Sequence, residues 1–366
     1  FITRLLQSGL IKKEELAQKY KNEIHANEIV LLAYYIAAIN IESVYHSIEG
    51  GEYIPFEGIC LTDTFQLYEK EDLISRLMVD NSERRTRQKN LDIKVIIGNP
   101  PYSAKQESAN DNNQNVAYPS LDARIRETYT ERSTATNKNA LYDSYIRAIR
   151  WASDRVGKSG IVGFVTNAGF VEANTAAGLR QCLVEEFSSI YVFHLRGNQR
   201  TSGETSRKEG GKIFGSGSRA PIAITFLIKN PKAKEHGKIL FHDIGDYLTR
   251  EEKLQRVADF QSVEGITSKN DWKQIVPDEH GDWLRQRDES FGKFIVMGDK
   301  GGDNACALFW NYSSGVKTQR DAWCYNSSKS DVAANMERMI SFYNNEVSRF
   351  KKSPQGRLDK SARDAI

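Results

Sequence analysis

The segment DIKVIIGNPPY, residues 92–102, decides the expected fold of this chain. Residues 92–98 form an apolar run that ends at Gly98, which is typical of a parallel strand buried on both faces of a sheet. In open α/β sheets, ligands bind beyond the carboxyl ends of the strands. The sequence Asn99-Pro100-Pro101-Tyr102 therefore stands where such a fold places its site.

Strands and helices alternate on both sides of this segment. Strand patterns occur at residues 22–30, 57–65, 161–166, 189–195 and 221–229. Apolar residues with helical spacing occur within residues 1–19, 31–41, 141–156, 175–187 and 331–350. The alternation predicts an α/β fold with a doubly wound, mostly parallel sheet and a late antiparallel hairpin within residues 189–229.

Composition narrows the class of protein. The 366 residues are 39% hydrophobic and 27% charged, which favours a globular protein of two domains, or of one large domain with appendages. No apolar run reaches the roughly 18 residues of a membrane span. The cysteines lack the spacing of metal ligands or of a disulfide framework and indicate a reducing cytoplasm; they are Cys60, Cys182, Cys306 and Cys324. A net charge of +3 is only mildly basic, so any surface for nucleic acid must be local.

The turn at residues 99–102 has unusual chemistry. Its two prolines fix φ and remove backbone donors, so the turn is stiff and offers carbonyl acceptors. Such a turn suits a planar amine like N6 of adenine, whose lone pair is delocalised into the ring. The Asn99 side-chain oxygen and the Pro100 carbonyl can each accept one N–H of this amine, and Tyr102 can stack on the base. Alignment and electrostatics then supply the catalysis, and no metal or covalent intermediate is needed. The alternative is an ordinary turn at the end of a strand.

On these residues the chain resembles the amino-methyltransferases, in the motif order of N6-adenine DNA methyltransferases, over about residues 1–230. The resemblance implies a Rossmann-like methyltransferase sheet and S-adenosylmethionine as the cofactor. It implies that Phe1 ends a Gly-rich cofactor loop whose glycines lie upstream. Glu28 matches the acid that binds the cofactor ribose, and Asp63, with Thr64 beside it, matches the contact to the cofactor adenine. Each acid could instead be a helix cap or a solvated group.

The same resemblance implies a second aromatic residue on the other side of an extruded base. Phe214, in the loop before the strand at 221–229, fits this place; its alternative is an anchor in the core. The preceding loop, residues 196–219, is basic and is expected to hold DNA phosphates, although such loops are often simply solvated. Its cations are Arg196, Arg200, Arg207, Lys208, Lys212 and Arg219, against Glu204 and Glu209. Residues 103–139 are expected to be irregular.

More narrowly, the chain resembles the single-chain restriction–modification enzymes called type ISP. The matching phrases are VIIGNPPYSA, ALYDSYIRAIRWAS, GFVTNAGFVEAN and GVKTQRDAWCYN. The resemblance implies double-stranded DNA as the partner, with nuclease and helicase-like domains upstream in the parent chain. It divides the chain into a methyltransferase domain, residues 1–235, and a connector with the start of a target-recognition region, residues 236–366.

Two other functions fit parts of the pattern. The same four-residue turn occurs in enzymes that methylate RNA or protein glutamine, because these substrates also present a planar NH2. A catalytically silent DNA-binding scaffold is the other alternative. Methylation assays on DNA, RNA and protein separate the three.

The expected cofactor loop gives a first prediction. Residues 1–366 expressed alone should bind S-adenosylmethionine weakly or not at all, because the Gly-rich turn that closes over the methionine would be absent. Adding a few dozen upstream residues should restore binding. Calorimetric titration of both proteins measures this, and tight binding by the shorter one would contradict the expected construction of the cofactor site.

Overall fold

The computed structural model describes residues 1–66, 79–102, 117–135, 137–215, 218–286, 290, 293–300, 306–313, 315, 318 and 320–352. The chain forms two compact units, Phe1–Arg287 and Asp288–Ile366. Among the described helices, none combines the length and the apolar character needed to cross a membrane.

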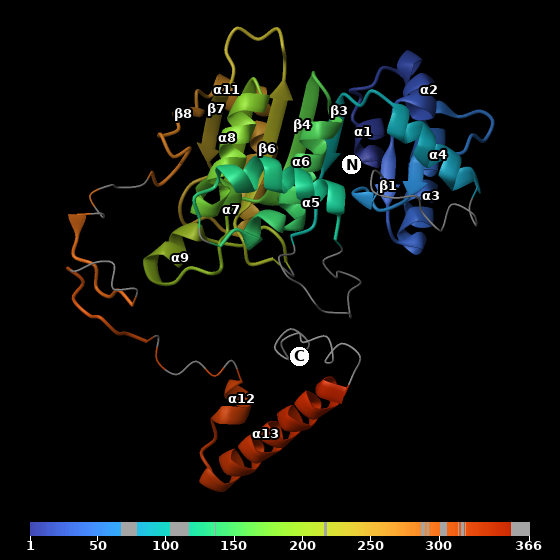
Figure 1. The fold of residues 1–366 in the computed structure, drawn as a ribbon. Coiled ribbons are helices and arrows are strands. Elements are labelled where there is room, and N and C mark those ends of the chain that lie inside the picture. Colours follow the sequence, from blue (N-terminus) through green and yellow to red (C-terminus); the bar gives the residue numbers. More distant parts are fainter. Residues whose placement is uncertain are drawn as a thin grey trace. The chain divides into compact units, whose positions relative to one another are not determined.

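The first unit contains two sheets (Figure 1). Its strands are β1 (Ala26–Glu28), β2 (Ile59–Leu61), β3 (Val95–Gly98), β4 (Gly160–Asn167), β5 (Ser189–Arg196), β6 (Ile222–Lys229), β7 (Lys238–Asp243) and β8 (Lys273–Ile275). The small sheet pairs β1 with β2 in parallel, and the large sheet has the order β3-β4-β6-β5-β7-β8. Strand β6 is antiparallel to both β4 and β5, which confirms the predicted hairpin within residues 189–229.

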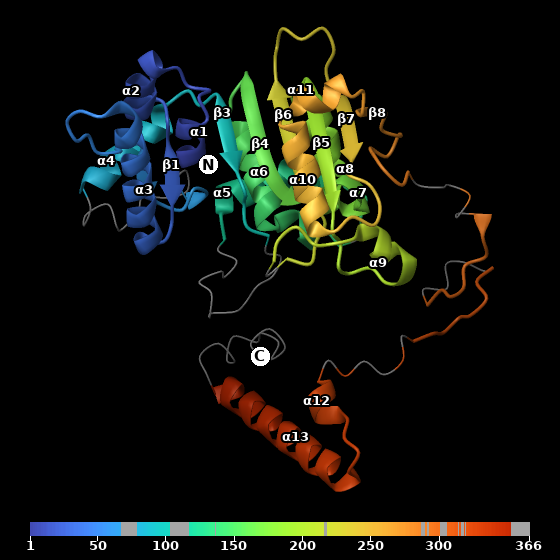
Figure 2. The same cartoon turned by 180° about the vertical axis from the view of Figure 1, so that it is seen from behind.

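Helices cover both faces of the large sheet. The helical segments of the first unit are α1 (Ile2–Gln7), α2 (Lys13–Asn22), α3 (Leu31–Glu49), α4 (Val79–Asn90), α5 (Pro119–Ile125), η4 (Arg126–Thr130), η5 (Asn139–Tyr142), α6 (Ser144–Arg155), α7 (Gly169–Glu172), η6 (Asn174–Ala176), α8 (Ala177–Glu186), α9 (Gly203–Glu209), α10 (Arg250–Phe260) and α11 (Val263–Ser268). Figure 1 shows α6 and α8 in front of the sheet, and Figure 2 shows α10 and α11 on the opposite face. The doubly wound α/β architecture is therefore as predicted.

Each face of the large sheet has its own core. On the α6 and α8 side, Ile149 and Leu183 pack with Val162, Leu227 and other buried residues. On the α10 and α11 side, the buried cluster consists of Phe193, Leu195, Ile213, Ile222, Ile244 and Ile266. Tyr102 packs against both clusters, so the predicted turn lies where the two cores meet at the end of the sheet.

Strand β3 differs from its prediction. Val95 and Ile97 are 55% and 57% exposed, so β3 is not buried on both faces. Within the described residues β3 pairs only with β4, as β1 pairs only with β2, and each therefore has one unpaired edge. The apolar run identified the strand correctly, but an edge strand has no second neighbour to cover its side chains.

Three segments are more regular than expected. Residues 1–19 form two helices rather than one, because the chain turns at Gly9, whose φ is +74°. Within residues 103–139, the described part from residue 117 contains α5 and the π-helix η4, while residues 103–116 and 136 lie outside the described residues. The basic loop contains the short helix α9.

The first unit extends beyond residue 235, the expected end of the methyltransferase domain. Strand β7 pairs in parallel with β5, and β8 pairs with β7. Further along, the buried Arg180 of α8 donates to Asp282 Oδ1 at 2.5 Å and to the carbonyl oxygens of Phe170, Ala173 and Gly281. Residues as far as Asp282 are therefore part of the same packed body.

The second unit contains α12 (Asp321–Cys324) and α13 (Lys329–Lys352). Helix α13 covers the predicted amphipathic helix at residues 331–350. No side chain of α13 is buried, and Ile340, Phe342 and Tyr343 are exposed.

The Arg180–Asp282 pair gives a stability prediction. Arg180→Leu should lower the free energy of unfolding by about 3–5 kcal/mol, because it leaves a buried carboxylate without its cation. Arg132→Leu is the matched control on an exposed pair with Glu185 and should cost about 1 kcal/mol or less. Urea denaturation measures both, and equal losses would mean that Asp282 is not held as described.

Candidate active site

The turn after β3 forms a hydrogen-bonded unit with the neighbouring strand. The Tyr102 hydroxyl lies 2.8 Å from Asn99 Oδ1 and 3.1 Å from the carbonyl oxygen of Val165 in β4, and can donate to either. Burial raises the pKa of Tyr102 to about 12, so the hydroxyl keeps its proton at neutral pH. The two predicted catalytic side chains are thus in direct contact, and Asn99 Oδ1 retains a second lone pair for another donor.

Aromatic rings surround Tyr102. The centroid of the Phe214 ring lies 6.4 Å away, with an angle of 46° between the two planes. The centroid of the Tyr145 ring lies 6.3 Å from that of Tyr102, in an edge-to-face arrangement. Phe214 also packs against the buried cluster that contains Ile213. The structure therefore brings together Asn99, Tyr102 and Phe214, the three side chains expected around the substrate base.

Glu28 ends β1 and is held by the chain that follows it. Its Oε1 atom accepts hydrogen bonds from the backbone N–H groups of Ile29 and Val30, at 2.8 and 3.0 Å. The parallel register pairs Glu28 with Leu61, so Asp63 follows at the same edge of the small sheet. The two acids thus follow adjacent strand ends, as expected for a pair that binds one cofactor. Both donors precede α3 (Leu31–Glu49), so Glu28 bonds none of the N–H groups of the first turn of that helix.

Asp63 is more engaged than the sequence suggests. Its Oδ1 atom accepts from the Phe65 N–H at 2.9 Å, and Oδ2 accepts from the Tyr118 hydroxyl at 2.8 Å. The Tyr118 ring packs edge to face on Phe65. The Arg147 guanidinium lies over the Tyr118 ring, 5.3 Å from its centroid. Tyr118 thus orients the carboxylate, a role that sequence reasoning missed.

Two further residues were expected to bind the cofactor. Thr64 lies in the turn after β2, beside Asp63, and is half-buried. Phe1 stands at the start of α1, with its side chain 69% exposed.

The structure divides the cations of the basic loop into two groups. Arg196 is paired with Asp243 Oδ1 at 2.7 Å and also with Asp246, and its side chain is only 20% exposed. Lys208 lies 3.9 Å from Asp246. The count of charges within residues 196–219 missed these two acids, because Asp243 ends β7 and Asp246 lies just after it. Arg196 is therefore committed to the protein, contrary to its expected role as a phosphate ligand.

The other arginines are more available. Arg200, Arg207 and Arg219 are exposed, and Arg207 makes only a surface pair with Glu204 at 3.3 Å. Lys212 is half-buried. The candidate phosphate contacts are thus concentrated on the three exposed arginines.

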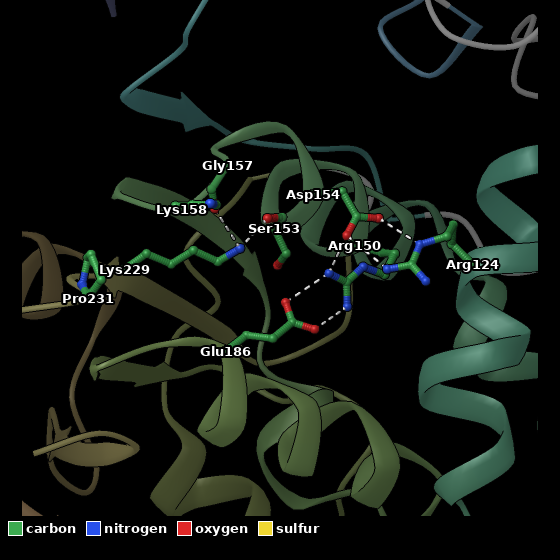
Figure 3. Close-up of a pocket in the computed structure, with 9 residues that line it drawn as sticks. All are labelled: Arg124, Arg150, Ser153, Asp154, Gly157, Lys158, Glu186, Lys229 and Pro231. Carbon is green, nitrogen blue, oxygen red and sulfur yellow. Dashed lines mark hydrogen bonds and ion pairs between the residues drawn. The ribbon is translucent and has the colours of Figure 1, made fainter.

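A charged pocket lies at the opposite end of the sheet (Figure 3). Lys229 Nζ donates to the carbonyl oxygens of Ser153 and Gly157, and the buried Arg150 forms a bidentate pair with Glu186. Lys229 pairs with Gly160, the first residue of β4, whereas Asn99 lies near the carboxyl end of that strand. These ion pairs and hydrogen bonds tie α6 to α8 and β6, at the end of the sheet away from Asn99.

No group of three or more His, Cys, Asp and Glu side chains among the described residues is arranged to hold a metal ion. The candidate site is built instead from amide oxygens, two carboxylates and aromatic rings.

The sheet covered by helices on both faces, with Asn99-Pro100-Pro101-Tyr102 after β3, is the arrangement expected of an amino-methyltransferase. The family model described as Eco57I restriction-modification methylase matches residues 9–200, more than half of the chain, and the chain belongs to this family. The model described as Type ISP C-terminal specificity domain matches residues 307–365. No curated protein sequence matches the chain.

Three solved structures show the same fold. A nuclease-deletion mutant of the Type ISP restriction-modification enzyme LlaGI, in complex with a DNA substrate mimic, is 46% identical, with a TM-score of 0.85 over 95% of this chain and 28% of that chain. The ATP-dependent Type ISP enzyme LlaBIII bound to DNA is 44% identical, with a TM-score of 0.84 over 94% and 23%. The DrdV–DNA complex is 37% identical, with a TM-score of 0.83 over 98% and 34%. The chain thus spans only about a quarter to a third of the length of these proteins.

The division of the basic loop gives the third prediction. Replacing Arg200, Arg207 and Arg219 with Gln should weaken DNA binding and reduce the slope of log affinity against log salt by about 0.9 for each lost phosphate contact. Replacing the exposed Lys12, Lys13 and Lys21 with Gln makes the same change in charge and should leave the slope unaltered. Arg196→Gln should instead lower thermal stability, because it frees Asp243 and Asp246. Fluorescence anisotropy across a salt series measures the slopes, and equal slopes for both triple variants would exclude the loop from the DNA contact.

Proposed function

We propose that this chain is the methyltransferase part of a restriction–modification enzyme and transfers a methyl group from S-adenosylmethionine to N6 of adenine in double-stranded DNA. The observation that carries the proposal is the contact of the Tyr102 hydroxyl with Asn99 Oδ1 at the carboxyl end of β3, with Phe214 close by. Membership of the restriction-modification methylase family supports DNA as the substrate.

The turn selects a planar amine. Asn99 Oδ1 and the Pro100 carbonyl present two acceptors, and neither proline offers a competing backbone donor. An amine that donates one N–H to each acceptor is held with its lone pair directed at the incoming methyl group. The acceptors also stabilise the positive charge that develops on the nitrogen during transfer. Tyr102, which is tied to Asn99 and β4, fixes the orientation of the acceptor.

The bound base needs two stacking faces. An adenine extruded from a duplex loses a few kcal/mol of pairing and stacking. Contacts with Tyr102 and Phe214 offset this at roughly 1–3 kcal/mol for each stacked face. The two rings are tilted by 46° relative to each other, so the bound base requires them to become more nearly parallel.

The described residues fit a nucleoside-containing cofactor at the ends of β1 and β2. Glu28 has one oxygen fixed by backbone N–H groups, which orients the carboxylate for the hydroxyls of a ribose. Asp63 is oriented by Phe65 N–H and Tyr118, and its oxygens can accept a further donor, such as the amino group of the cofactor adenine. When bound, S-adenosylmethionine supplies an electrophilic sulfonium methyl group.

The partner in this proposal is double-stranded DNA, held by the exposed arginines of the basic loop. The solved relatives LlaGI, LlaBIII and DrdV are DNA complexes, and their greater length supports further domains in a parent chain, upstream ones included. The specificity-domain match at residues 307–365 supports target recognition by the second unit. The proposed division is a catalytic part with its connector, followed by the start of the recognition part.

The fourth prediction tests the chemistry in the full-length protein. Asn99→Ala should lower adenine methylation on the order of 100-fold and leave DNA binding largely intact, because it removes an acceptor used in the transition state. Tyr102→Ala should have a similar effect. Asn230→Ala is the control, since this asparagine follows β6 at the opposite end of the sheet.

Methyl transfer from radiolabelled S-adenosylmethionine to DNA, RNA and a glutamine peptide measures the outcome. Near-wild-type transfer to DNA by Asn99→Ala would disprove the assigned site. Transfer by the wild type to RNA or peptide, but not to DNA, would replace the proposed substrate.

A further inference from the structure

Lys253 is a fully buried lysine beneath the basic loop. It lies in the first turns of α10 with an exposed fraction of 0%, although lysine is rarely enclosed without a partner. Its Nζ atom donates to the carbonyl oxygens of Glu209 and Gly211, each at 2.7 Å. Both acceptors belong to the loop that leads to Phe214, so a charged side chain from α10 holds the backbone of that loop.

Arg250, one turn earlier on α10, makes the next contact along the same loop. Its Nε atom donates to the carbonyl oxygen of Ile213 at 2.8 Å. Ile213 is buried, and its neighbour Phe214 packs against the same cluster. The three carbonyl groups of residues 209, 211 and 213 are thus fixed by two cations of one helix.

The backbone also fits closely against the segment before α10. The Gly211 N–H donates to the Leu248 carbonyl oxygen at 2.9 Å. A Cβ atom on Gly210 would lie 2.2 Å from that same oxygen, and a Cβ atom on Gly211 would lie 2.5 Å from the backbone nitrogen of Arg250. Only glycine permits this approach, which brings the loop within reach of Lys253.

We propose that Lys253 and Arg250 are positioning residues that clamp the backbone of residues 209–213 and thereby hold Phe214 against the substrate base. Neither side chain touches the base; each acts through the loop carbonyl groups. The proposal rests on the proposed function for the identity of the base, while the clamp itself is a property of the loop. It assigns part of the expected connector a direct role in the catalytic site.

Burial determines how the clamp responds to pH. It lowers the pKa of Lys253 to about 8; Glu209 and Asp243 act in the opposite direction, and Arg196 in the same direction as burial. Because this pKa lies below that of a solvent-exposed lysine, deprotonation between about pH 8 and 10.5 favours the buried position of the side chain. The neutral amine still has two N–H groups for the two carbonyl oxygens, so the clamp is retained as pH rises.

The test compares three substitutions on α10 in the full-length protein. Lys253→Met and Arg250→Met each remove a contact with the loop. Arg256→Met is the matched control for Arg250→Met, because Arg256, like Arg250, is exposed on α10 and donates to a carbonyl oxygen, that of Ile244, which lies outside the loop. Phe214→Ala sets the size of the full effect: it should reduce methylation of a paired target adenine more than of a mismatched one, which is already partly unstacked.

Lys253→Met should lower the ratio of paired to mismatched methylation by roughly tenfold, and Arg250→Met should lower it in the same direction. Arg256→Met should leave the ratio at its wild-type value. Wild-type ratios in both clamp variants, or an equal loss in Arg256→Met, would overturn the proposal.

Amide hydrogen exchange provides a readout that needs no methylation. Residues 209–214 should exchange faster in Lys253→Met and in Arg250→Met than in the wild type or in Arg256→Met. If Lys253→Met fails to fold, as judged by urea denaturation, Arg250→Met decides the outcome. Unchanged exchange in the folded clamp variants would overturn the clamp. If the wild type does not methylate adenine, but residues 209–214 exchange faster in the clamp variants as expected, only the proposed function is overturned.

Discussion

Strand β6 runs antiparallel between β4 and β5, and its hydrogen bonds to both neighbours are the constraint on which the site depends. Its first residue, Ile222, pairs with Asn167 at the end of β4 and with Arg196 at the end of β5. The loop before β6 therefore leaves the sheet at the edge where the turn after β3 lies. This reversal brings Phe214 to Tyr102, although the two residues belong to distant parts of the chain.

The two ends of the large sheet are stabilised by different chemistry. At one end, the buried Arg150 is paired with Glu186, and the half-buried Lys229 donates to a carbonyl oxygen of α6. At the other end, Asn99 and Tyr102 are neutral and lie among aromatic rings. A neutral amine on a flat ring requires acceptors and stacking surfaces rather than an ion pair. The immediate surroundings of Asn99 and Tyr102 are therefore suited to a base.

Local sequence patterns predicted the elements whose signals are local. The apolar run before Asn99, the helix within residues 141–156 and the hairpin within residues 189–229 were all recognisable from spacing and turn residues. The strand β8 was missed because it has only three residues, and β7 because it lies in a segment of dense charge. The exposure of β3 was also missed, since periodicity describes a strand but not the number of its neighbours.

The site shows the same limit. Asn99 and Tyr102 were predictable because one motif contains both. The partners of the other residues are set by folding: Tyr118, just before α5, reaches Asp63, and Asp246 neutralises Arg196 from the segment after β7. A count of charges within residues 196–219 could not include acids that only the sheet brings close. No sequence pattern indicated that Lys253 is buried, because an isolated lysine in a helix is usually exposed.

The bond between Tyr102 and Asn99 has a consequence for selectivity. The Tyr102 hydroxyl engages one lone pair of Asn99 Oδ1 and leaves the other for a further donor, so an arriving amine meets an acceptor whose direction is already fixed. A hydrogen bond exchanged with water contributes only about 0.5–1.5 kcal/mol net. Contacts beyond the amine must therefore supply most of the free energy with which a substrate is held.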